Sequence, residues 1–506
     1  MYSVNVNGAV PFNNKATHCV GTGRMDLALH KEYLDQLKLV QDEIGFSFIR
    51  GHGLFSKDMA IFRTYRDGDV VKDEYNFTYL DMVMDSYLSM NIRPILELGF
   101  MPKDLASGEQ TVFYWKGNVT PPADYDRWAN LVKATLSHLM DRYGRDDVIN
   151  WPIEVWNEPN LPVFWKDADM EEYFKLYEVT VKAVKETDSE FKVGGPAICG
   201  VDDIRWLKGF LDMVSDRKLP LDFVSRHHYT SYNPNPSGHC GYIELHEPQD
   251  AFRWLERSRD IVDSYPEFKD KEIFITEFNT SYIPNATIHD TTLNAAYVAH
   301  MLSRLGDKHE SYSYWTFGDI FEEWGVPFTP FHGGFGLVAD GCIPKPTFWT
   351  FAFYSRLTGR GIMKNDDGVL TRRDDGSIAG VLQNPDLHGE KKSKTVEIEL
   401  DGLADGEYFL LSEIVNDRFG NPLKTWHEMG EPASLNDGQK TLLRKIATPG
   451  SETSNITVTG GRATLKFGLE PNEVRYVNLL PVKRTNDRGY DYERTISQVA
   501  VPEKEE

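Results

Sequence analysis

Two stretches of sequence decide the fold of this chain: Ile153-Glu154-Val155-Trp156-Asn157-Glu158-Pro159 and Ile273-Phe274-Ile275-Thr276-Glu277-Phe278-Asn279. Each begins with apolar and β-branched residues, as a buried strand does, and each reaches a glutamate where the apolar run ends. In a parallel α/β barrel the carboxyl ends of the strands meet on one face, where chemistry takes place. Glu158 and Glu277 are therefore the first candidates for a shared site.

The region around both stretches, from about residue 17 to 360, alternates short apolar runs with amphipathic helical patterns. Strands separated by helices favour parallel pairing through right-handed crossovers. This pattern predicts a (β/α)8 TIM barrel over residues 14–360. A doubly wound open sheet is the alternative, although no GxGxxG turn follows an early strand. The expected strands are His18–Gly21, Phe46–Arg50, Ile92–Leu98, Ile153–Trp156, Lys192–Gly195, Phe223–Tyr229, Ile273–Phe278 and Tyr312–Phe317.

The pattern of apolar and polar residues changes after residue 360. Residues 361–482 alternate polar and apolar positions, as in Thr395-Val396-Glu397-Ile398-Glu399-Leu400 and Arg475-Tyr476-Val477-Asn478-Leu479-Leu480. Such alternation predicts a C-terminal accessory β-sandwich with antiparallel strands and one solvated face. Met1-Tyr2-Ser3-Val4-Asn5-Val6 alternates likewise, and residues 1–13 are expected to join the sandwich. The charged end, 483–506, is interpreted as a solvated tail, with an interaction arm as the alternative.

Charge and composition exclude several classes of function. The chain has 55 basic and 77 acidic residues, a net charge of −22, which disfavours nucleic acid and anionic membranes as partners. No apolar run is long enough to span a bilayer, and the N-terminal residues do not read as a secretory signal, so a cytoplasmic location is expected. The four cysteines form no CxxC pair, and only His239 beside Cys240 hints at a metal ligand. No metal site is expected.

The placement of the two glutamates indicates a reaction. Glu158 follows the fourth expected strand and Glu277 ends the seventh, and these strands face each other across a barrel mouth. Cleavage of a glycosidic bond needs one protonated carboxyl and one carboxylate, about 5–5.5 Å apart when the second attacks directly. Asn157 is placed to direct its amide at the sugar's 2-hydroxyl. Either tripeptide alone is an ordinary turn, but together they indicate a retaining glycosidase.

Several segments resemble glycoside hydrolase family 39, and within it the bacterial β-xylosidases. The resemblance implies Glu158 as acid/base, Glu277 as nucleophile, and no metal or organic cofactor. It also implies exo-acting release of xylose from the non-reducing ends of xylo-oligosaccharides. The segments are Trp156–Asn160, Phe164–Asp169 and Phe274–Asn279, with further matches at Phe48–Gly53, Phe223–His227 and Gly318–Glu323.

The same resemblance assigns further residues to the substrate. Strand alternation places His227 and Tyr229 on one face, with Tyr229 donating to Glu277, whereas His228 is expected to pack against a helix. Arg50 is expected to orient the nucleophile, with a barrel-interior salt bridge as the alternative. The rings of Tyr282 and Trp315 are expected to form walls for the sugar ring, with barrel packing as the alternative for Trp315. The expected substrate-binding residues are His52, Asn157, His227, Tyr229, Tyr282, Trp315, Glu322 and Glu323.

Other functions stay open at this stage. A related glycosidase could act on another sugar, as an arabinosidase or an iduronidase does, although a uronate would require Lys or Arg in a pocket whose expected lining is acidic or neutral. A non-catalytic carbohydrate-binding barrel or a metal-dependent barrel enzyme are further alternatives. The sequence is compatible with a homo-oligomer, either a dimer or a tetramer. It does not determine which leaving group the enzyme prefers.

Overall fold

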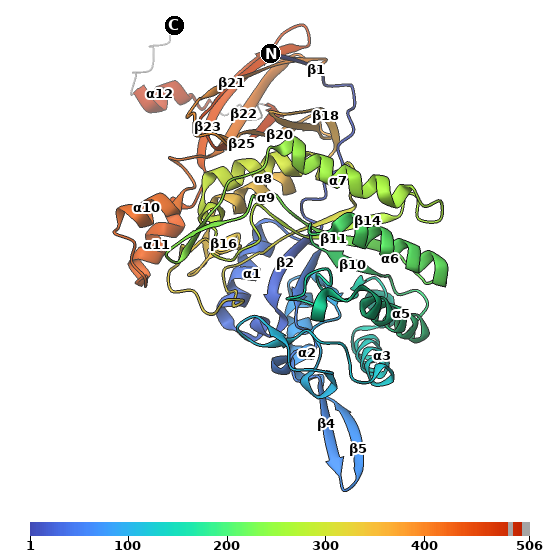
Figure 1. Ribbon diagram of the computed structural model, residues 1–506. Helices are drawn as coiled ribbons and strands as arrows, with labels where there is room; N and C mark the ends of the chain where they lie inside the picture. Colours follow the sequence, from blue (N-terminus) through green and yellow to red (C-terminus); the bar gives the residue numbers. More distant parts are fainter. Residues whose placement is uncertain (484–488, 498–506) are drawn as a thin grey trace, which may run out of the picture.

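The computed structural model describes residues 1–483 and 489–497. Eight parallel strands close into a barrel in chain order, each paired with the next and the last with the first. The predicted (β/α)8 barrel is confirmed, and the open doubly wound sheet is wrong (Figure 1). The barrel strands are β2 (Cys19–Arg24), β3 (Phe48–His52), β6 (Arg93–Glu97), β9 (Ile153–Glu154), β10 (Val193–Ile198), β11 (Phe223–Tyr229), β14 (Glu272–Asn279) and β15 (Ser311–Tyr314).

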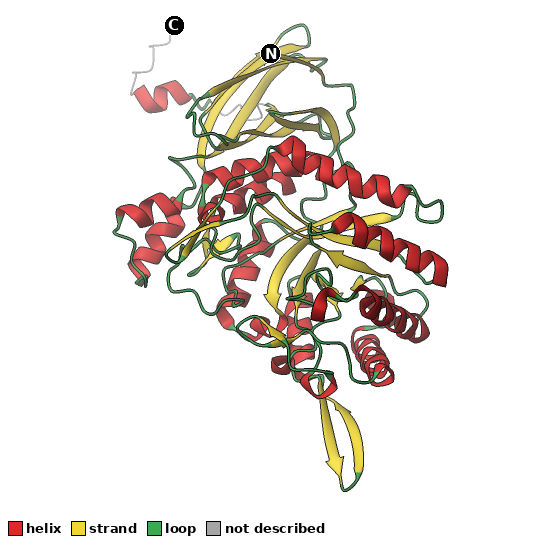
Figure 2. Ribbon diagram, in the orientation of Figure 1, coloured by secondary structure: helices red, strands yellow, loops and turns green. Residues whose placement is uncertain are grey.

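Helices follow every barrel strand and cover the outside of the barrel (Figure 2). Helix α5 shows why: Tyr173, Phe174, Tyr177, Val181 and Val184 share one helical face, and all five are buried. The helices are α1 (Lys31–Glu43), α2 (Thr78–Ser89), α3 (Tyr125–Tyr143), α4 (Arg145–Val148), α5 (Met170–Thr187), α6 (Asp203–Arg217), α7 (Pro248–Asp263), α8 (Thr292–Leu305) and α9 (Pro346–Ser355).

Four short hairpins interrupt the loops that leave the carboxyl ends of the strands. The longest, β4 (Phe62–Asp67) with β5 (Val70–Tyr75), projects away from the barrel at the bottom of Figure 1. The sequence patterns did not predict these hairpins. The others are β7 (Thr111–Val112) with β8 (Gly117–Asn118), β12 (Asn235–Ser237) with β13 (Cys240–Tyr242), and β16 (Val338–Ala339) with β17 (Ile343–Pro344).

The C-terminal part forms two further sheets that lie beside α8 and α9 at the top of Figure 1. The larger has the order β18-β19-β20-β25-β22-β23 and is antiparallel throughout. In the smaller, β1 joins β21 in parallel and β24 is antiparallel to β21. The strands are β1 (Tyr2–Asn5), β18 (Arg360–Asn365), β19 (Gly368–Arg372), β20 (Ile378–Asn384), β21 (Lys394–Asp401), β22 (Gly406–Val415), β23 (Gly450–Val458), β24 (Arg462–Leu469) and β25 (Glu473–Pro481).

The expectation of one solvated face is wrong for the middle of the larger sheet. One of its faces packs against the smaller sheet, through residues such as Leu370 and Leu479. Its other face packs against the barrel's outer helices, where the rings of Tyr476 and Phe353 stack 5.7 Å apart. Most of β20 and β25 is therefore buried on both sides, whereas β24 alternates strictly between buried and exposed positions.

Two helices, α10 (Pro422–Glu428) and α11 (Asp437–Ile446), lie between β22 and β23 where only strands were expected. Most of the predicted tail lies outside the described residues, which include α12 (Tyr492–Ser497) within it. The boundaries 14–360 and 361–482, with residues 1–13 joined to the second domain, stay a prediction. Among the described helices, none has the length and apolar composition that crossing a membrane requires.

Candidate active site

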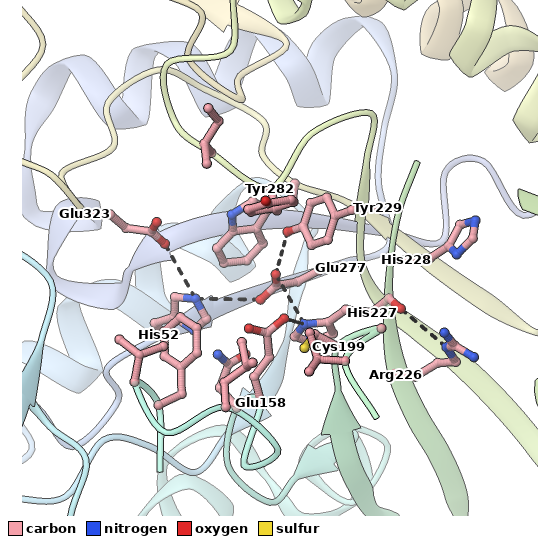
Figure 3. Close-up of a pocket in the computed structure, with 18 of the residues that line it drawn as sticks. His52, Glu158, Cys199, Arg226, His227, His228, Tyr229, Glu277, Tyr282 and Glu323 are labelled. Atoms are coloured by element: carbon pink, nitrogen blue, oxygen red, sulfur yellow. Dashed lines mark hydrogen bonds and ion pairs between the residues drawn. The ribbon is translucent and has the colours of Figure 1, made fainter. Parts of the chain in front are cut away.

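A cavity of about 940 Å³ opens at the carboxyl ends of the barrel strands (Figure 3). All but one of the residues predicted to act on the substrate line it. The exception is Glu322, whose carboxylate instead lies 2.6 Å from Nη2 of Arg24. The predicted residues on the cavity wall are His52, Asn157, Glu158, His227, Tyr229, Glu277, Tyr282, Trp315 and Glu323.

A strained turn presents Glu158 to the cavity. Trp156 and Glu158 both adopt positive φ, 73° and 44°, a region that non-glycine residues seldom occupy and that concentrates at functional sites. The backbone N–H of Glu158 donates to the carbonyl of Ala197 at the end of β10, and the Trp156 indole donates to the carbonyl of Phe164. These bonds hold the turn in a conformation that aims the carboxyl inward.

Glu277 projects from β14, where it stands in register with His227 of β11. Its Oε1 pairs with the guanidinium of Arg50, which is fully buried. Its Oε2 accepts a hydrogen bond of 2.6 Å from the hydroxyl of Tyr229. A cation and a hydroxyl thus hold both oxygens of this carboxylate in fixed directions.

The two glutamates lie close together. A carboxylate oxygen of Glu158, one of Glu277 and a ring nitrogen of His227 lie within 4.8 Å of one another. Inverting glycosidases separate their carboxyl groups by about 6.5–9.5 Å to admit a water molecule, whereas retaining ones keep about 5–5.5 Å. The observed separation therefore matches direct attack by one carboxylate.

The surroundings assign different protonation states to the two carboxyls. Burial raises the pKa of Glu158 well above its usual value, and the charge of Glu277 raises it further. Burial also raises the pKa of Glu277, but Arg50, His52 and the Tyr229 hydroxyl oppose that shift. Of the two, Glu158 is the group that keeps a proton and Glu277 the group that loses it.

Two buried glutamates, Glu97 and Glu154, complete the network and were not predicted. Oε2 of Glu97 lies 2.7 Å from Nδ1 of His52, and Oε2 of Glu154 accepts from Nε of Arg50 at 2.8 Å. Both lie within expected barrel strands. A charged residue inside an apolar strand was the signal that could have found them, because a buried charge requires a partner.

Aromatic and acidic side chains form one end of the cavity, which we call the proximal end (His52, Asn157, Trp315, Glu323). The ring of Trp315 lies 4.7 Å from that of His52, whose Nε2 is 3.9 Å from Oε1 of Glu323. The Oδ1 atom of Asn157 accepts from Arg50 at 2.9 Å, which leaves its N–H groups for a ligand. Tyr282 stands at the rim, 46% exposed.

The opposite end of the cavity contains residues that sequence reasoning did not assign. Arg226, Trp254 and Arg257 line it together with His228, which packs 6.3 Å from the Trp254 ring on α7. The expectation that His228 packs against a helix is met, yet its ring also borders the cavity. Figure 3 shows Arg226 and His228 on the side opposite Glu323 and His52, with Glu158 and His227 between them.

Glu158, His227 and Glu277 are the one group of residues in the described chain whose ligand atoms lie close enough to hold a metal ion. Hydrogen bonding accounts for their arrangement, since Nδ1 of His227 is 2.7 Å from Oε1 of Glu158. Burial also lowers the pKa of His227 well below its usual value, so the imidazole is neutral. The three groups are thus arranged as a proton-holding network.

Comparison with known proteins agrees with this geometry. A family model described as glycosyl hydrolases family 39 matches residues 4–464. A β-xylosidase of Geobacillus stearothermophilus is 48% identical over 489 residues, covering 96% of each chain, and one of Caldicellulosiruptor saccharolyticus is 34% identical, covering 91% of this chain and 94% of the other. The crystal structure of a monomeric β-xylosidase from Caulobacter crescentus matches with a TM-score of 0.86 at 30% identity, over 95% of this chain and 99% of that one.

Proposed function

We propose that this chain, which belongs to glycosyl hydrolase family 39, is a retaining, exo-acting β-D-xylosidase that releases xylose from the non-reducing ends of xylo-oligosaccharides. β-Xylosidases that match nearly its whole length support the choice of sugar. The observation that carries the mechanism is the pair of buried carboxyls, Glu158 and Glu277, with oxygens within 4.8 Å.

In the first step, an oxygen of Glu277 attacks the anomeric carbon of the terminal xylose. The carboxyl of Glu158 gives its proton to the glycosidic oxygen, which leaves with the shortened oligosaccharide. The ion pair with Arg50 and the Tyr229 hydrogen bond keep Glu277 ionised and aligned for this attack. The product is an ester between xylose and Glu277.

In the second step, Glu158 acts as a base because it has lost its proton. It takes a proton from water, whose oxygen attacks the anomeric carbon and displaces Glu277. Two displacements restore the original configuration. Loss of the negative charge on Glu277 in the ester removes a repulsion, which lowers the pKa of Glu158 and suits its change from acid to base.

The proximal end is the proposed site of the terminal xylose. His52 and Trp315 are both 2% exposed, so rings wall off the cavity where a further sugar would have to extend. A wall at this position favours action at chain ends. We propose the following substrate-binding residues: His52, Asn157, His227, Tyr229, Tyr282, Trp315, Glu322 and Glu323. Glu322 would act there only after releasing Arg24.

Two observations bear on other sugars. A glycosidase acting on a uronate requires a free cation near the terminal sugar, but the buried cation at this end, Arg50, already pairs with Glu97, Glu154 and Glu277. Burial and the neighbouring glutamates raise the pKa of Glu323 well above its usual value. This carboxyl therefore suits a sugar with neutral hydroxyl groups better than it suits a uronate. An arabinosidase stays the enzymatic alternative.

We further propose a cytoplasmic role in xylan degradation. Four free thiols, two of them buried, suit a reducing compartment. A dimer or tetramer stays a prediction.

The test is hydrolysis of aryl glycosides, with the first-formed anomer followed by NMR. We expect the β-xyloside to react faster than the β-glucoside, the α-arabinofuranoside or the α-iduronide, and to yield β-xylose first. Release of α-xylose first, or a preferred α-arabinofuranoside, would contradict the proposal.

A further inference from the structure

The far end of the cavity forms a compartment of its own, which we call the distal lobe (Asp203, Arg226, His228, Trp254, Arg257). Its residues come from strand β11 (Arg226, His228), the start of α6 (Asp203) and helix α7 (Trp254, Arg257). Glu158 lies between Arg226 and His228 on one side and His52 and Glu323 on the other (Figure 3). Because Glu158 protonates the leaving oxygen in the proposed function, the group that leaves extends from Glu158 into the distal lobe.

The distal lobe has more positive than negative charge. Two guanidinium groups share one carboxylate: Nη2 of Arg257 lies 3.0 Å from Oδ2 of Asp203, and Nη2 of Arg226 lies 3.3 Å from the same oxygen. Arg226 is almost fully buried and also donates to Ser258 and to the carbonyl of His227. The Arg257 side chain is 41% exposed and lines the cavity.

The N-terminus of α6 adds to this field. Asp203 is its first residue, and the preceding residue, Asp202, makes no capping hydrogen bond with its side chain. Gly200 and Val201, just before the helix, line the cavity. The uncapped N–H groups of a first helical turn attract negative charge.

An unpartnered polar atom lies in the same lobe. Nε2 of His228 is buried and has no hydrogen-bond partner among the described residues. Burial lowers the pKa of His228 well below its usual value, so the ring is neutral and one of its nitrogens is able to donate. Buried polar atoms of this kind ordinarily have a partner, and the ring that carries this one lines the cavity.

We infer that the distal lobe is the site of the leaving group, and that it selects leaving groups that carry a carboxylate. Arg257 is the residue that contacts this carboxylate, and the Trp254 ring provides an apolar wall beside it. The contrast with the proximal end is chemical: acidic and aromatic groups hold the neutral xylose, while cations receive the rest of the substrate. This inference rests on the proposed function.

The test compares two aryl β-xylosides that differ in one charge, 4-carboxyphenyl β-xyloside and its methyl ester. The kcat/KM of each substrate is measured with the wild type and with Arg257→Met. The intrinsic reactivity of the leaving group cancels when the variant's kcat/KM is divided by that of the wild type. We expect Arg257→Met to lower kcat/KM for the carboxylate about fivefold more than for the ester, as for a partly exposed charged pair. Arg257→Lys should retain most of the preference.

Arg253→Met is the matched control. Arg253 lies one turn earlier on α7, is 71% exposed, pairs with Asp250 and does not line the cavity. Its replacement removes a charge of the same sign from the same helix and should leave kcat/KM unchanged for both substrates. Equal losses for both substrates in Arg257→Met would overturn the inference. If the wild type hydrolyses neither xyloside, the proposed function itself fails.

A second pair of substrates identifies the source of the carboxylate. One is xylobiose whose reducing-end unit carries a glucuronic acid branch, and the other is the same compound with the carboxyl reduced to an alcohol. If Arg257→Met selectively impairs the acid here, acidic xylo-oligosaccharides are the natural substrates. If only the aryl pair discriminates, the leaving group is an aromatic acid.

Discussion

Nδ1 of His227 lies 2.7 Å from Oε1 of Glu158, so a neutral, fully buried imidazole holds the proposed proton donor. The same nitrogen is 3.4 Å from Oε2 of Glu277. The histidine was expected to bind substrate, but its geometry gives it a second role, because its Nδ1 atom contacts both carboxyl groups.

Replacing His227 by alanine should impair proton donation more than nucleophilic attack. We expect kcat/KM for phenyl β-xyloside to fall about tenfold to a hundredfold, within the range of a general acid's contribution. The loss should shrink for 2,4-dinitrophenyl β-xyloside, because that leaving group departs without a proton. A series of aryl xylosides measures this, and an equal loss across the series would indicate a general structural defect.

Tyr229→Phe should shift the acidic limb of the pH profile. The hydroxyl bond of 2.6 Å lowers the pKa of Glu277, so its removal raises that pKa and protonates the nucleophile at a higher pH. A hydrogen bond to a charged group contributes about 1.5–3 kcal/mol, which corresponds to a shift of roughly one pH unit or more. The measurement is kcat/KM against pH. An acidic limb that does not move would show that Tyr229 does not stabilise the ionised carboxylate.

The alkaline limb should report Glu158. Activity is lost as pH rises through its pKa, because the donor is then ionised, and burial and the charge of Glu277 place that pKa well above the usual value. Glu277→Gln removes the repulsion and should lower the pKa of Glu158. Titration of the Glu158 carboxyl by NMR in both proteins measures the change; an unchanged pKa would mean that the two groups are not coupled.

A buried ion triad should stabilise the loop that carries Glu323. Nζ of Lys345 lies 2.7 Å from Oδ1 of Asp290 and 2.6 Å from Oδ2 of Asp319, and all three side chains are buried. Lys345→Met leaves two buried carboxylates without their cation and should cost about 3–5 kcal/mol of unfolding free energy.

Lys364→Met is the control for that variant, because it breaks a partly exposed pair with Asp307 and should cost about 1 kcal/mol or less. Urea unfolding of both variants measures the difference. Similar losses in the two would show that the triad contributes no more than a surface pair.

The barrel was predictable because each of its strands carries its own apolar run, and the pattern repeats eight times. The positions of Glu158 and Glu277 followed from the strand count. The sequence did not show which of Glu322 and Glu323 lines the cavity, because both lie in an irregular loop without periodicity. Packing turns Glu323 toward the cavity and Glu322 toward Arg24. The buried β25 was misjudged because its own sequence does not reveal the helices that cover its second face.

Azide rescue separates the two carboxyl roles. Glu277→Gly opens space beside the anomeric carbon on the nucleophile's side, so azide should restore part of the lost turnover and give α-xylosyl azide. Glu158→Gly leaves the nucleophile in place, and azide should then attack the ester and give β-xylosyl azide. The anomeric form of each product is read by NMR. The reverse pair of products would exchange the roles of the two glutamates.

The most direct test of the central claim is covalent trapping of the nucleophile. A 2-deoxy-2-fluoro-β-xyloside with a good leaving group should inactivate the enzyme. The fluorine slows both formation and breakdown of the ester, whereas the good leaving group speeds formation only, so the ester accumulates. Mass spectrometry of peptides from the inactivated protein should locate one fluoroxylosyl group on Glu277. An adduct on Glu158, or hydrolysis without any adduct, would contradict the account.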